Sequence, residues 1–193
     1  MDNDGSVIRS GGMDFDSILE GLRAGDERRF GELWRALNPA LVRFLSGLAG
    51  PDDAADLASM VWLDVVRGLP GFKGTESGFR AWMFTIARSR TIDLRRSQGR
   101  MPDRHGDHEE ADHREGPAVD PAELVAERSA TDEAVALIGS LPPDQAEVLL
   151  LRVIADLDVA TVARIIGKRP GTVRVLAHRG LRRLAELLEP TEV

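Results

Sequence analysis

Apolar residues recur along this chain at spacings of three and four positions, and no stretch alternates convincingly between apolar and polar residues. Spacings of three and four put apolar side chains on one face of an α-helix, whereas alternation is typical of a β-strand. The pattern therefore predicts an all-α fold. A polar stretch, residues 101–129, interrupts it. We expect two small helical domains, residues 13–100 and 130–190, joined by an acidic flexible linker, and a disordered N-terminus over residues 1–12.

Four helices are predicted in the first half. The first two cover residues 14–22 and 26–49. The third begins at Pro51 and has acids in its first turn, where carboxylates complement the positive end of the helix dipole. A stretch that contains four glycines or prolines then breaks the regularity, and a fourth helix is expected over residues 77–97.

In the second half, the last two predicted helices are separated by Gly167 and a few polar residues. Gly167 suits the left-handed C-cap of the first helix, and Pro170 suits the first turn of the second. Two short helices joined by such a turn form a helix-turn-helix motif. On a helical wheel, one side of residues 171–188 is apolar and is expected to be core. It holds Val173, Leu176, Ala177, Gly180, Leu181, Leu184 and Leu188.

The opposite side of this last helix is cationic and carries no acid. It holds Arg174, Val175, His178, Arg179, Arg182 and Arg183. The whole chain is acidic, with a formal net charge of −7, but residues 101–130 supply −6 of it. Charges attract within a Debye length of about 8 Å in physiological salt, so the basic face acts locally. An acid-free basic face favours a polyanion such as duplex DNA, and the alternative is a solvated face that contacts an acidic protein.

The second helix of a helix-turn-helix enters the major groove with its N-terminal residues against the base edges. Arg174 and His178 are therefore expected to donate to base acceptors, and Val175 to contact a thymine methyl group. Phosphates are expected to be held by Lys168, Arg169, Arg182 and Arg183.

A second basic surface is predicted on the helix over residues 77–97. One side of that helix is apolar and holds Phe79, Trp82, Met83, Ile86, Ala87 and Leu94. The other side carries Phe84, Arg88, Thr91 and Arg95. An exposed aromatic ring among arginines suits single-stranded nucleic acid, because the ring stacks on unpaired bases and the guanidinium groups pair with phosphates.

Several classes of chemistry have no candidate in the sequence. The chain has no cysteine, which excludes disulfides and thiolate sites, and it has no apolar run long enough to cross a membrane, so we expect a cytoplasmic protein. The cluster His105, His108 and His113 matches no known metal-ligand spacing, and we expect no metal or other cofactor. With no phosphate-binding loop, nucleophile elbow or paired carboxylates, we expect no enzyme activity.

The sequence "LPPDQAEVLLLRVIADLDVATVARIIGKRPGTVRVLAHRGLRRLAELL" resembles region 4 of bacterial extracytoplasmic-function (ECF, group 4) sigma factors, members of the sigma-70 family. Independently, "DDAADLASMVWLDVVRGLPGF" followed by "GFRAWMFTIARSRTIDLRRSQ" resembles their region 2. Together the two resemblances cover roughly residues 15–100 and 130–188, in the family's order. They imply a promoter-specificity subunit that binds core RNA polymerase and directs transcription initiation.

In such a subunit, region 4 reads the upstream (−35) promoter element as duplex. The resemblance implies that this role falls to Lys168, Arg169, Thr172, Arg174, Val175, His178, Arg179, Arg182 and Arg183. Region 2 opens the downstream (−10) element and binds the melted non-template strand, and a loop before its last helix captures a flipped base. The residues implied for that role are Lys73, Thr75, Glu76, Arg80, Phe84, Arg88, Thr91, Arg95 and Arg96.

The resemblance also implies contacts with core polymerase. The helix that begins at Pro51 aligns with the family's surface for the clamp helices of the largest subunit, while region 4 contacts the flap. The implied clamp residues are Asp53, Asp56, Leu57, Met60, Val61 and Asp64. Many members have Gln-Glu where this chain has Ser59-Met60, so a polar contact is lost or replaced by apolar packing. An anti-sigma factor is a further candidate partner.

The −6 charge of the linker suits the positively charged cleft of polymerase and is expected to disfavour binding of the isolated subunit to free DNA. The main alternative is a stand-alone helix-turn-helix regulator whose first half is a dimerisation or sensing domain. Such a regulator would bind a dyad-symmetric site without polymerase.

Overall fold

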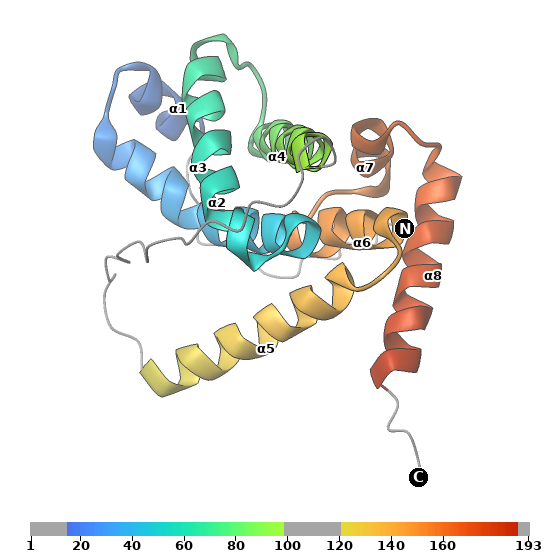
Figure 1. Ribbon diagram of the computed structural model, residues 1–193. Coiled ribbons are helices and arrows are strands. Elements are labelled where there is room, and N and C mark those ends of the chain that lie inside the picture. The colour runs from blue at the N-terminus through green and yellow to red at the C-terminus, as the bar shows by residue number, and fades with distance from the viewer. Residues whose placement is uncertain (1–14, 99–120, 189–193) are drawn as a thin grey trace, which may run out of the picture.

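The computed structural model describes residues 15–98 and 121–188, with side chains from residue 130 onward in the second range. Both ranges are helical, which confirms the predicted all-α fold (Figure 1). The first half contains α1 (Phe15–Arg23), α2 (Glu27–Ala49), α3 (Pro51–Gly68), the 3₁₀ turn η1 (Leu69–Gly71) and α4 (Glu76–Gln98). The second contains α5 (Pro121–Gly139), α6 (Pro143–Leu149), the π-helical turn η2 (Leu150–Ile154), α7 (Val159–Ile166) and α8 (Pro170–Leu188).

The helix ends follow local chemistry. Asp26 caps α2 by accepting hydrogen bonds from the backbone N–H groups of Arg28, at 2.9 Å, and Arg29. Pro51 occupies the first turn of α3, as predicted. α5 begins at Pro121, inside the range predicted as linker, while the expected disordered N-terminus and the most acidic part of the linker lie outside the described residues.

The first four helices enclose an aromatic core. Phe79 of α4 meets Phe15 edge to face with ring centroids 5.6 Å apart, and Phe44 meets Phe84 in the same way at 5.1 Å. Trp62 of α3 is buried, and its indole Nε1 donates a hydrogen bond to Asn38 Oδ1 of α2 at 2.9 Å. Because buried polar groups require partners, this bond fixes how α3 lies against α2.

Replacing Asn38 by alanine should destabilise the fold by about 1–3 kcal/mol, because the buried indole N–H is left without an acceptor. Thermal unfolding followed by circular dichroism should show a Tm several degrees lower. Asn38→Asp keeps an acceptor oxygen and serves as the control. Equal Tm values for Asn38→Ala and the wild type would contradict this role of the bond.

The two halves share one continuous apolar core. α2 packs against α5 and α6 of the second half as well as against α3 and α4 of the first. Gly47 of α2 allows the close approach: a Cβ atom there would lie 2.8 Å from both methyl carbons of Leu150. A Cβ at Gly139 of α5 would lie 2.8 Å from the Gly47 carbonyl oxygen. Leu150 and Val135 are fully buried at this seam, and burying one such side chain contributes roughly 1.5–3 kcal/mol, more than an exposed ion pair does.

Candidate nucleic-acid interface

α7 and α8 form the predicted helix-turn-helix (Figure 1). Gly167 follows α7 in the left-handed conformation with φ of 69°, and its N–H bonds to the Ala163 carbonyl, as the sequence predicts for a C-cap. Pro170 opens α8, also as predicted. α8 is anchored by the buried Val173 and Gly180, and a Cβ at Gly180 would lie 2.8 Å from Leu149 Cδ1 of α6. The motif therefore holds α8 at the edge of the molecule with one face outward.

Asp158 caps the start of α7 through one carboxylate. Its Oδ1 accepts from the backbone N–H of Ala160 at 2.8 Å and of Thr161 at 2.9 Å, and its Oδ2 accepts from the Thr161 hydroxyl at 2.7 Å. These bonds, the one from the Thr161 hydroxyl foremost, lower the pKa of Asp158 below its ordinary value.

Replacing Asp158 by alanine should lower the free energy of unfolding by about 0.5–2 kcal/mol, because α7 loses its cap. Since folding lowers the pKa of this carboxyl, its stabilising effect is complete above its ordinary pKa of about 3.9 and disappears as the pH falls through the folded value. Urea titrations at pH 7 and near pH 3 measure both effects. The difference between wild type and Asp158→Ala should shrink at the lower pH; a constant difference would contradict the assignment.

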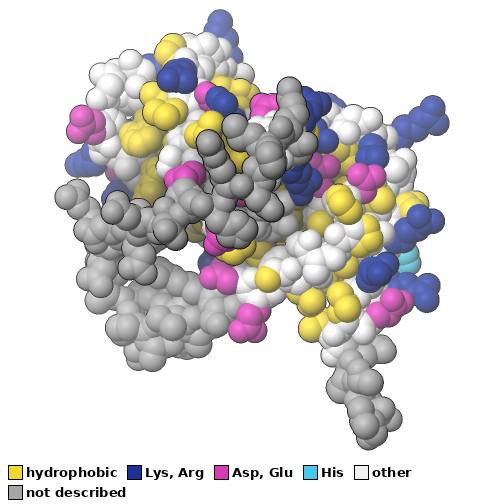
Figure 2. All heavy atoms as spheres, in the orientation of Figure 1, with side chains coloured by type: hydrophobic (Ala, Val, Ile, Leu, Met, Phe, Trp, Pro, Cys, Tyr) yellow, Lys and Arg dark blue, Asp and Glu magenta, His cyan; other side chains and the backbone are white. Residues whose placement is uncertain are grey.

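The outward face of α8 carries the predicted cationic strip. Arg174, Val175, His178, Arg179, Arg182 and Arg183 are all exposed, as are Arg169 and Thr172, while Lys168 is half-buried. Figure 2 shows dark-blue Lys and Arg side chains along the edge of the molecule where α8 lies. Lys168 Nζ pairs with Asp144 at 2.9 Å and Arg182 with Glu186 at 3.2 Å. Among the described residues, Arg174 and Arg179 form no ion pair, so both charges face outward uncompensated.

The apolar side of α8 is only partly buried. Leu176, Ala177 and Leu184 are half-buried, but Leu181 and Leu188, which the wheel places in the core, are 55% and 70% exposed. The prediction is wrong for these two residues because α8 leaves the body after Gly180 and its last turns extend past α6 (Figure 1).

On α4 the predicted exposed face is wrong at two positions. Phe84 is 0% exposed and packs on Phe44, and Thr91 is buried with its hydroxyl bonded to the Ala87 carbonyl. The wheel assumes one buried face, whereas α4 is covered by α2 and α3 and is also contacted by α7. Phe84 and Thr91 therefore cannot stack on or contact bases in this conformation.

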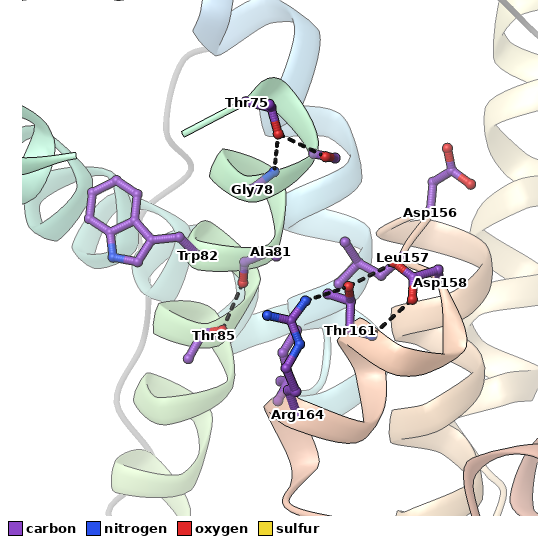
Figure 3. Close-up of a pocket in the computed structure, with 12 residues that line it drawn as sticks. Thr75, Gly78, Ala81, Trp82, Thr85, Asp156, Leu157, Asp158, Thr161 and Arg164 are labelled. Carbon is purple, nitrogen blue, oxygen red and sulfur yellow. Dashed lines mark hydrogen bonds between the residues drawn. The ribbon is translucent and has the colours of Figure 1, made fainter. Parts of the chain in front are cut away.

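The remaining candidates on and before α4 lie at or near the surface. Lys73, Thr75, Glu76, Arg95 and Arg96 are exposed, and Arg80 and Arg88 are half-buried. The Thr75 hydroxyl accepts a hydrogen bond from the backbone N–H of Gly78 at 3.3 Å, which fixes the loop to the start of α4 (Figure 3). Arg88 Nε donates to Glu147 Oε1 of α6 at 2.7 Å, and Arg95 donates to the Leu48 carbonyl.

A cleft of about 560 Å³ separates the start of α4 from α7. Thr75 and Trp82 line it from one side and Asp158 and Thr161 from the other, and Arg164 extends from α7 toward α4 (Figure 3). Trp82, expected as core, is half-buried and stacks on Phe72 with ring centroids 5.2 Å apart. The cleft therefore lies between the two halves, next to the loop predicted to bind a base.

The candidate clamp residues on α3 divide into three groups. Leu57 and Val61 are in the core, so their predicted contact with a partner does not fit this structure. Asp64 is half-buried and bonded to Arg90 of α4. The accessible members are Asp53, Asp56 and Met60. The structure adds two exposed apolar residues that sequence reasoning missed, Leu63 and Val66, and the three-residue spacing from Met60 was a signal that could have found them.

Models of two protein families match the chain. Residues 33–101 match sigma-70 region 2 and residues 131–184 match sigma-70 region 4, together more than half of the chain. ShbA, an ECF RNA polymerase sigma factor of Streptomyces griseus, is 33% identical over 172 residues, which cover 86% of this chain and 90% of ShbA. This chain is an ECF sigma factor. It directs RNA polymerase to promoters, as members of this non-enzymatic family do.

Other relatives of this sigma factor agree in length and fold. The ECF sigma factor SigD of Mycobacterium tuberculosis is 29% identical, with 89% of this chain and 82% of SigD covered. The sigma factor RpoE of Bartonella quintana, solved in complex with the anti-sigma factor NepR, is 23% identical and superimposes with a TM-score of 0.61, covering 84% of this chain and 98% of RpoE. This likeness shows the shared fold.

Two further findings concern sites outside the helix-turn-helix. None of the helices in residues 15–98 and 121–188 is long and apolar enough to cross a membrane. The histidines weighed as metal ligands, His105, His108 and His113, lie outside the described residues, and within the described ones no three His, Asp or Glu side chains gather as a metal site.

Proposed function

We propose that α8 reads the −35 element of a promoter as duplex DNA. The observation that carries this proposal is the exposed cationic face on the second helix of the helix-turn-helix, with Arg174 and Arg179 outside any ion pair in the described part of the chain. Arg174 and His178 donate to base edges near the start of α8, and Val175 contacts a thymine methyl group. The phosphate contacts come from Lys168, Arg169, Arg182 and Arg183.

The −10 element is bound by the loop before α4 and by the basic residues of α4. Lys73, Thr75 and Glu76 are exposed next to the cleft, where a flipped base of the non-template strand has room to enter. Arg88, Arg95 and Arg96 pair with phosphates of the melted strand. Burial removes Phe84 and Thr91 from this set, so stacking must come from another ring or from the guanidinium planes of arginine.

α3 binds the clamp helices of the largest polymerase subunit. Its exposed Met60, Leu63 and Val66 provide an apolar centre, and the acids Asp53 and Asp56 near its start attract basic residues of the partner. Region 4 contacts the polymerase flap. An anti-sigma factor, such as NepR is for RpoE, competes for these surfaces, and the protein acts in the cytoplasm where it meets polymerase.

Run-off transcription with purified core polymerase on a genomic promoter library tests the proposal. Transcripts should start downstream of two shared sequence boxes at a fixed spacing, and only when the protein is present. Binding to a dyad-symmetric site in a gel shift without polymerase, with no promoter-dependent transcript, would instead support the stand-alone regulator.

A further inference from the structure

We infer that region 4 is an intramolecular latch on region 2: in the free protein it docks on α2 and α4, occupies Arg88, and keeps the −10 surface from DNA. This inference rests on the proposed role of α4 in binding the −10 strand. It explains why the proposed −10 surface is only partly accessible in a chain that must use it. Three features at the seam between the halves support it.

The first feature is the ion pair between Arg88 of α4 and Glu147 of α6, with Nε and Oε1 2.7 Å apart. Its side chains are 27% and 16% exposed, so water and salt screen it less than the pairs at the surface. A carboxylate that accepts from the guanidinium group takes the place that a DNA phosphate would take. Arg88 is therefore available to the −10 strand only after α6 has moved away.

The second feature is the crossing of α2 and α5 at two glycines. A side chain at Gly139 would meet the Gly47 backbone, and one at Gly47 would meet Leu150 and Val135 of the second half. Glycine within a helix is less stable than alanine, so neither position favours glycine in a region that acts alone. The two glycines fit a close contact between regions 2 and 4, which indicates that docking is encoded in the sequence.

The third feature is the cleft between α4 and α7. Thr75, part of the proposed base-binding loop, lines the cleft opposite Asp158 and Thr161 of region 4. The acidic side chains Asp156 and Asp158 lie on the region 4 wall, where they repel an incoming phosphate. A melted strand approaching the loop from this side meets region 4 until the two halves separate.

Core polymerase opens the latch because it binds region 2 and region 4 at separate places. A ligand shifts an equilibrium between two conformations only by its difference in affinity for them, and polymerase favours the separated one. In the free protein, the apparent affinity for a −10 strand is reduced in proportion to the fraction of open molecules. Variants that disfavour docking should therefore bind the strand more tightly without any change to the DNA-binding residues.

The decisive variant is Gly139→Ala in the full-length protein. The added methyl group would lie 2.8 Å from the Gly47 carbonyl oxygen, so α5 must shift away from α2, while alanine favours the helix itself. Gly31→Ala is the matched control, because Gly31 lies in α2 with only the distal atoms of Arg35 nearby, 3.8 Å away. Small-angle X-ray scattering should give a larger radius of gyration for Gly139→Ala than for the wild type and Gly31→Ala.

Fluorescence anisotropy with a single-stranded oligonucleotide of the −10 sequence from a run-off promoter measures the second consequence. Gly139→Ala should bind about fivefold to tenfold more tightly than the wild type. Glu147→Arg, which sets two cations face to face, should do the same, while Glu20→Arg on the exposed side of α1 adds an equal charge as its control. Equal radii of gyration, or a larger radius with unchanged affinity, would overturn the latch.

The holoenzyme separates this inference from the proposed function. With saturating core polymerase, Gly139→Ala and the wild type should initiate transcription equally, because polymerase holds the halves apart in both. If neither protein supports transcription, the proposed promoter function fails. If both do but all variants bind the oligonucleotide alike, only the latch fails.

Discussion

Replacing Arg174 and Arg179 together by alanine should reduce transcription from a −35-dependent promoter by about a hundredfold or more, since a lost base or phosphate contact costs about 1–3 kcal/mol and 1.4 kcal/mol is tenfold. Both side chains are exposed on α8 and lie outside ion pairs among the described residues, so no acid has to be displaced before they meet DNA. The substitutions leave Val173 and Gly180, which anchor α8, unchanged. Run-off assays with reconstituted holoenzyme provide the measurement.

The matched control is Arg28→Ala with Arg35→Ala on α2, which removes the same charge from exposed positions in region 2. It should retain most of the activity. The salt dependence adds a second readout, because each lost phosphate contact reduces the slope of log affinity against log salt concentration by about 0.9. Equal losses in both double variants would show that net charge, not α8, governs initiation.

The helix-turn-helix could be predicted from the sequence because its geometry depends on neighbouring residues. A left-handed C-cap requires a residue such as Gly167, and Pro170 is compatible with few positions other than the first turn of a helix. The cationic face of α8 was equally predictable, since like charges on one side of a helix need no tertiary information. Local chemistry of this kind defines both the fold class and the −35 surface.

The face of α4 could not be predicted in the same way. A helical wheel sorts residues around one buried side, but α4 is enclosed over a wide arc, so Phe84 is in the core and Arg88 is held at a contact with α6. On α3 the same assumption placed Leu57 on the surface. These errors have one cause: which side of a helix is covered depends on helices distant in the sequence.

The seam between the halves was also invisible in the sequence. Gly47 and Gly139 stand 92 positions apart, and only the structure shows that their backbones approach each other. The chain was divided correctly into two helical halves, but an open pair of domains was assumed. The shared core changes the view of its regulation, because the same residues that stabilise the docked form restrict access to the −10 surface.

Leu63→Glu should weaken binding to core polymerase by about a hundredfold while leaving the fold intact. Leu63 is 56% exposed on α3 between Met60 and Val66, and a carboxylate there has to be desolvated when a partner helix covers this apolar strip. Its exposure in the free protein means that no core contact is lost, so the Tm should stay within a few degrees of the wild type. Native gel shift or biolayer interferometry with core enzyme measures the affinity.

Ser59→Glu is the control for this variant, because it adds the same charge at an exposed position of the same helix without removing apolar surface. If the strip is the polymerase contact, Ser59→Glu should bind within a fewfold of the wild type, and Leu63→Glu should also lose promoter-directed transcription although its α8 is untouched. Since −35 binding and polymerase binding are on different helices, the Leu63→Glu defect should be relieved by excess core enzyme, and the Arg174 and Arg179 defect should not. Wild-type affinity for Leu63→Glu would place the polymerase contact elsewhere than on α3.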